Sequence, residues 1–191
     1  AHKNTSERQR MMRYSISSDS WHEVSGMQDD VYLSSMTSDG ERYIYILPGS
    51  AGNNTRKILR YDSWTGRFSP ESIAISTSDR IAQDVPTNGI RWAGGNASTA
   101  TYDGRQYIYA INQNESTSSF SMFAKFDYQT GETVYLPPPP LIGIGGSMAH
   151  LGGAVYYLPG RSTHEFYRFN ETDGQWVRMS DTPATIYRPG P

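Results

Sequence analysis

The sequence predicts an all-β protein built from three copies of a four-stranded antiparallel unit, preceded by a partial copy. Aromatic residues make up 13% of the 191 residues, and 14 of them are Tyr. Glycine and proline number 18 and 11, a composition typical of many short strands separated by tight turns. The third observation is an internal repeat, which sets the order of the strands.

The first half of the repeat is a strand of small residues, a glycine turn and an aromatic strand. The copies lie within residues 34–71, 98–138 and 147–183. Their turns fall at Gly40, at Gly104 and at Gly152-Gly153. Each copy is therefore predicted to begin with a β-hairpin.

The second half of the repeat is another aromatic strand that ends in Asp or Asn, a turn with Gly, and a last strand. It begins at Tyr61, Phe126 and Phe169, and a partial copy begins at Tyr14. These starts are spaced by 47, 65 and 43 residues. Asp or Asn opens the turn and Gly supplies a positive φ, so this half is also predicted to be a hairpin.

A sheet of four short strands cannot bury both of its faces alone, but side-by-side copies cover one another. Radial stacking of such sheets makes a β-propeller, which needs at least ~4 blades to close. The expected organisation is a single propeller segment: a partial blade in 1–33, blades in 34–71, 98–138 and 147–183, and an insertion loop in 72–97. Additional blades, from the same or another chain, are expected to complete the ring.

The repeat resembles the kelch repeat, whose blades carry a turn glycine, a Tyr-x-Tyr/Phe-Asp strand and a later Trp. Tyr167-Arg-Phe-Asn170 followed by Trp176, and Tyr14 followed by Trp21, fit this pattern best. The sequence departs from kelch blades after the second strand, where it lacks their Gly-Gly doublet. The resemblance implies that the ligand site lies on the face formed by second-to-third-strand loops and blade-to-blade connections.

Six residues are predicted to lie on that loop face. Arg80, Asp84, Arg91 and Trp92 come from the insertion, and Arg161 and His164 from the last blade. A loop as long as the insertion is either functional or simply elaborated, for example as an interface with a missing blade. Pro137–Pro140 is expected to be a stiff connection, with recognition by a proline-binding partner as the alternative.

Composition argues against several classes of partner and of chemistry. Charged residues make up 19% and the net charge is −2, so neither nucleic acid nor an anionic membrane surface is expected. No apolar run approaches the ~20 residues of a membrane span. Without cysteine the chain has no disulfide and no thiolate metal ligand. Residues 1–10 contain no apolar signal segment, and the missing initiating Met suggests a processed chain.

The sequence predicts a non-catalytic protein without metal or cofactor. Galactose-oxidase-like enzymes have similar blades, but their copper site needs a cysteine-modified tyrosine. The run from Thr172 to Trp176 has the wrong spacing for a sialidase turn, and Gly143–Gly146 is only a faint likeness of a phosphate loop. None of the histidines has the spacing of metal ligands; they are His2, His22, His150 and His164.

Five of the eight asparagines lie in Asn-x-Ser/Thr acceptor sites for N-glycosylation. They are Asn4, Asn53, Asn96, Asn114 and Asn170. The favoured hypothesis is an extracellular, glycosylated propeller that mediates protein–protein or protein–glycan contacts as a scaffold. The alternatives are a cytosolic kelch-type adaptor that binds a protein segment, and a fragment of a propeller enzyme that acts on carbohydrate.

Overall fold

A computed structural model describes the fold over residues 11–24, 35–47, 57–68, 73–74, 99–113, 121–130, 132–143, 146–160 and 163–185. Its strands are β1 (Met11–Ser15), β2 (Ser20–Val24), β3 (Ser35–Ser38), β4 (Tyr43–Leu47), β5 (Lys57–Asp62), β6 (Arg67–Phe68), β7 (Ile73–Ala74), β8 (Thr99–Tyr102), β9 (Tyr107–Gln113), β10 (Ser121–Asp127), β11 (Thr133–Leu136), β12 (Ser147–Leu151), β13 (Ala154–Leu158), β14 (Tyr167–Asn170) and β15 (Gln175–Arg178). Among the described residues, no helix is long and apolar enough to cross a membrane.

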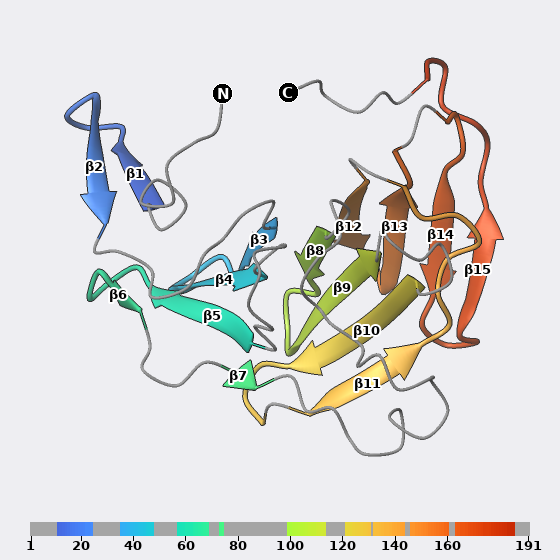
Figure 1. The fold of residues 1–191 in the computed structure, drawn as a ribbon, viewed down its shortest axis with the longest axis horizontal. Helices are drawn as coiled ribbons and strands as arrows, with labels where there is room; N and C mark the ends of the chain where they lie inside the picture. Colours follow the sequence, from blue (N-terminus) through green and yellow to red (C-terminus); the bar gives the residue numbers. More distant parts are fainter. Residues whose placement is uncertain are drawn as a thin grey trace.

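The strands form three complete antiparallel blades and one hairpin, as the repeat predicts. Blade A has the order β3-β4-β5-β6, blade B runs from β8 to β11, and blade C runs from β12 to β15. Within the described part of the chain, β1 and β2 form a two-stranded hairpin, which corresponds to the partial first copy. Inner strand β8 contacts both β3 and β12, and the later strands of each blade follow outward (Figure 1). This arrangement is that of propeller blades.

Local turn chemistry explains why the strands end where they do. Gly40, Gly104, Gly152 and Gly153 have positive φ, as the hairpin turns require. Before the first of these glycines, the Asp39 carboxylate accepts three backbone N–H groups of its own turn, each at 2.9 Å. Such bonds satisfy turn amides that have no strand partner. The predicted β-hairpins are confirmed at these turns.

The outer edge of blade A extends beyond the predicted end of the blade at residue 71. Ile73 pairs with Ile58 on β5, although residues 72–97 were expected to form an insertion loop. Phe68 already pairs with Tyr61 on the same strand, so two extra residues are accommodated between β6 and β7. β6 and β7 therefore both pair with β5.

The hydrophobic core consists of two layers, one between each pair of neighbouring blades. We call the side of a blade that is turned toward the next blade in the chain its forward face, and the opposite side its back face. Tyr45, Leu47 and Ile58 on the forward face of blade A pack against the back face of blade B, including Ile108 and Phe126. The second layer, between blades B and C, has Tyr109, Ile111, Phe123, Val155, Tyr157 and Phe169 at its centre. Each blade is thus buried by its neighbours rather than by a separate core.

The connection between blades B and C is packed against blade C. Pro139 is buried, and the Pro137 carbonyl accepts a hydrogen bond from Trp176 Nε1 at 2.7 Å. A Cβ added at Gly146 would lie 2.9 Å from the Tyr157 hydroxyl. The glycine at this position therefore allows the backbone to approach β13 closely.

Candidate functional site

The forward face of blade C is the third copy of a surface that is buried in blades A and B. Tyr45 of blade A and Tyr109 of blade B occupy the same repeat position, and both side chains are fully buried. The third copy of this position is Tyr156, whose side chain is partly exposed. Its ring stacks on Phe166, which precedes β14 in the same blade, with 5.9 Å between ring centroids.

A second repeat position shows the same difference. Leu47 and Ile111 are 2% and 0% exposed because the next blade covers them. Leu158 is their equivalent in blade C. In the sheet register, each of the three residues pairs with the first residue of the inner strand of its own blade. In blade C this leucine is partly exposed. An aromatic and an aliphatic side chain, both partly exposed, thus lie on a face that no further blade covers among the described residues.

A side-chain hydrogen bond links each inner strand to the next. Ser35 Oγ accepts the Ala100 N–H at 3.0 Å, and Thr101 Oγ1 accepts the His150 N–H at 3.1 Å. Both bonds run from the forward face of one blade to the backbone of the next. The blade C equivalent of Ser35 is Ser147, which is exposed.

The back face of blade A is uncovered at its inner strand. Met36 is 60% exposed, whereas its equivalents Ala100 and Met148 are 8% and 9% exposed. The difference arises because blade A covers Ala100 and blade B covers Met148. On the same back face Ile46 and Tyr61 are only 1% and 2% exposed, so Met36 is an exposed point on a face that is otherwise largely buried. The partly exposed forward face of blade C lies at the other end of the array.

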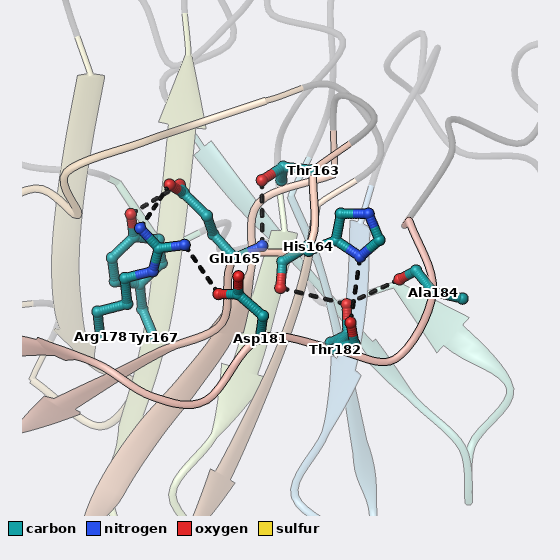
Figure 2. A network of polar contacts seen from close by, with 8 residues as sticks. All are labelled: Thr163, His164, Glu165, Tyr167, Arg178, Asp181, Thr182 and Ala184. Atoms are coloured by element: carbon teal, nitrogen blue, oxygen red, sulfur yellow. Dashed lines mark hydrogen bonds and ion pairs between the residues drawn. The ribbon is translucent and has the colours of Figure 1, made fainter.

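Of the six residues predicted for the loop face, His164 lies within the described part of the chain. His164 Nδ1 lies 3.1 Å from the Thr182 carbonyl oxygen (Figure 2). His164 Nε2 lies 2.7 Å from Thr185 Oγ1. The Thr182 N–H donates in return to the His164 carbonyl at 2.8 Å. His164 therefore holds the segment after β15 against the loop between β13 and β14.

A charged cluster beside His164 holds the same two segments together (Figure 2). Arg178 lies 3.2 Å from Glu165 and 2.8 Å from Asp181. The Tyr167 hydroxyl donates to Glu165 at 2.8 Å. Burial, followed by this hydrogen bond, raises the pKa of Tyr167 to about 12. The hydroxyl stays protonated at neutral pH, so the cluster acts as a structural clamp.

The other predicted site residues fall mostly outside the described part of the chain. They are Arg80, Asp84, Arg91, Trp92, Arg161 and the acceptor asparagines Asn4, Asn53, Asn96 and Asn114. Asn170 is described: it ends β14, is partly exposed, and its Oδ1 accepts the Thr172 N–H at 3.1 Å. Asn170 thus lies where β14 meets the following turn.

The described residues offer little that resembles a catalytic centre. Among them, no group of three or more His, Asp or Glu side chains is placed to hold a metal ion. Burial raises the pKa of three tyrosines in the second strands of the blades, Tyr45, Tyr109 and Tyr157, well above the usual value. These hydroxyls remain protonated and serve packing, as expected for aromatic residues in blade strands.

Sequence reasoning did not identify the uncovered faces, although the repeat contained the necessary signal. Alignment of the three copies identifies Tyr156 and Leu158 as equivalents of residues that pack between blades. The sequence does not say whether a further blade covers them.

Comparison with known proteins supports the fold. No protein-family model matches the chain, and no curated protein does either. Among solved structures, the chain is similar to the β-propeller protein TolB from Acinetobacter baumannii, with a TM-score of 0.56 and 14% sequence identity. The match covers 93% of this chain but only 40% of the TolB chain. At this identity the likeness concerns the fold alone, which is a β-propeller with four-stranded blades.

Proposed function

We propose that this chain is a kelch-like, non-catalytic binding and scaffold segment that functions by packing its end blades against further blades. These blades belong to the same or to another chain. The observation that carries the proposal is the exposure of Tyr156 and Leu158, whose equivalents are buried in both preceding blades. A partner with the same sheet architecture can cover this face in the way that blades B and C cover the faces before them.

Burial of these side chains provides the driving force for the contact. Full burial of one large apolar side chain contributes about 1.5–3 kcal/mol. A partner blade can also donate a backbone N–H to Ser147, as Ala100 does to Ser35. The register of the contact is therefore specified by a hydrogen bond as well as by apolar packing.

The two uncovered faces also differ from each other, so contacts between copies are head-to-tail. Met36 lies on a back face, while Tyr156 and Leu158 lie on a forward face. A forward face packs on a back face in both interfaces inside the chain. In a sample of the purified protein, the forward face of one copy is therefore expected to pack on the back face of a second copy.

Two single substitutions test the proposal in a complementary way. Met36→Glu and Leu158→Glu are each expected to lower the concentration-dependent association of the protein in sedimentation velocity. Each variant keeps the face that the other has lost, so an equimolar mixture is expected to form 1:1 pairs. Val134→Glu is the matched control, because Val134 is on an outer strand and is already 38% exposed with blade C beside it.

The proposal fails if the unsubstituted protein stays monomeric at high concentration, or if Val134→Glu lowers association as much as Leu158→Glu. It also fails if the mixture of the two variants remains monomeric while each variant is folded. Circular dichroism of each variant establishes folding independently of association.

We further infer that the protein is extracellular and N-glycosylated, which the excess of acceptor sites supports. Asn170 is partly exposed at a turn, where an acceptor is accessible. Intact mass of natively expressed protein is expected to fall by several glycan masses after enzymatic removal of N-glycans. An unchanged mass would favour the cytosolic adaptor instead.

A further inference from the structure

The interface between blades B and C contains a cavity at a place that aromatic rings fill between blades A and B. In the A–B interface, the Tyr128 ring lies 5.5 Å from Tyr45 and 5.8 Å from Tyr102. By repeat position, Tyr102 corresponds to His150 of blade C and Tyr128 corresponds to Glu171. Two tyrosines have thus been replaced by smaller, ionisable side chains in the second interface.

A shorter turn enlarges the same space. In blades A and B, the first hairpin turn carries Arg42 or Gln106, whose side chains bond to Asp62 and Asp127. In blade C the turn is reduced to Gly152-Gly153, because Leu151 pairs directly with Ala154. The two glycines have φ values of 60° and 76°, and they leave the backbone bare.

Together these changes leave a cavity of about 370 Å³, which is at the small end of ligand sites. It opens on the side of the first-hairpin turns, away from the loop face that the sequence favoured. Its lining consists of Asp103, Arg105, His150, Leu151, Gly152, Gly153 and Glu171.

Contacts with one another and with neighbouring residues hold the polar groups of the cavity in place. The His150 ring stacks on Tyr109 with 5.8 Å between centroids and 13° between planes. His150 Nε2 lies 2.9 Å from Glu171 Oε1, and the two side chains are 11% and 31% exposed. Asp103 Oδ1 accepts the N–H groups of Arg105, Gln106 and Tyr107. These contacts fix the imidazole and both carboxylates before any ligand arrives.

The balance of charge argues for a neutral ligand. A cation in the cavity would meet the Arg105 guanidinium, and an anion would meet the carboxylates of Asp103 and Glu171. Hydroxyl groups are compatible with the negative and the positive side chains of the cavity. Each hydroxyl can donate a hydrogen bond to a carboxylate and accept one from a guanidinium or an imidazole.

We propose that this cavity binds a single neutral sugar residue. The polar groups that line the cavity contact the hydroxyls of the sugar. The site lies between blades B and C and uses neither of the uncovered end faces, so it is separate from the scaffold role.

Saturation-transfer NMR of the 191-residue protein with a panel of neutral hexoses and N-acetylhexosamines tests the site. At least one sugar is expected to bind at millimolar concentration, and Arg105→Ala is expected to weaken it about tenfold through loss of charge-assisted hydrogen bonds. The double variant His150→Tyr/Glu171→Tyr restores the side chains found between blades A and B. It is expected to abolish binding without loss of fold. Glu132→Gln, an exposed carboxylate on the β10–β11 turn, is the matched control.

The proposal is overturned if no sugar of the panel binds, or if Arg105→Ala and Glu132→Gln bind equally well. It is also overturned if acetate or methylammonium binds while the sugars do not. Should the double variant fail to fold, Glu171→Gln decides in its place, because it keeps the shape of the side chain and removes its charge.

Discussion

Replacement of Phe123 by alanine is expected to lower the free energy of unfolding by about 3–5 kcal/mol. Phe123 is fully buried in the layer between blades B and C. Its ring lies 5.0 Å from Phe169, edge to face, and 5.1 Å from Trp176. Two sheets border this position, so neither side can collapse easily into the space that the ring vacates.

Urea denaturation followed by tryptophan fluorescence measures this loss, and Trp176 reports directly on the site. Val134→Ala, on the neighbouring strand β11 and 38% exposed, is the control and is expected to change stability by less than about 1 kcal/mol. The double variant Phe123→Ala/Trp176→Ala is expected to lose less than the sum of the single losses, since the rings touch. Equal losses for Phe123→Ala and Val134→Ala would contradict the layered core.

Replacement of Asp127 by asparagine is expected to lower stability by about 1–3 kcal/mol at neutral pH. Asp127 is 5% exposed, and its Oδ1 accepts N–H groups from Gln129 at 2.8 Å and Thr130 at 3.1 Å. Its Oδ2 accepts from Gln106 Nε2 at 2.5 Å. Asparagine has the same shape, but its side-chain NH₂ replaces one of the two carboxylate oxygens. This buried NH₂ then faces an N–H donor that the oxygen accepted from.

The pH dependence of this loss has a defined sign. Burial by itself raises the pKa of Asp127, but the hydrogen bonds from Thr130, Gln106 and Gln129 outweigh it and lower the pKa below the unfolded value. The stabilisation is therefore complete above the unfolded pKa of roughly 3.9 and is lost as pH falls through the folded value. The difference between the native protein and Asp127→Asn is expected to shrink at acid pH. A difference of the same size at pH values near 3 and near 7 would contradict the assignment, and exposed Asp173→Asn serves as the control.

Strand order and turn positions could be predicted because their causes are local. Gly40 and Gly104 mark turns that need positive φ, and Asp39 lies where its side chain can satisfy the amides of the turn. The alternation of buried and exposed residues follows from the pleat of each strand. Each of these features depends on neighbours within a few residues, and the repeat supplied several examples of each.

The features that bear on function arise from contacts between residues far apart in the chain. The sequence shows Tyr45, Tyr109 and Tyr156 as equivalent residues, and only the stacking of blades buries the first two and leaves the third partly exposed. His150 looked like an ordinary strand residue until Glu171 and Tyr109 were placed beside it. The pairing of Ile73 with Ile58 likewise depends on the position of β5. The sequence by itself determined the blades and their turns, whereas the tertiary structure decided which faces are covered and where a cavity remains, because burial depends on which sheets lie together.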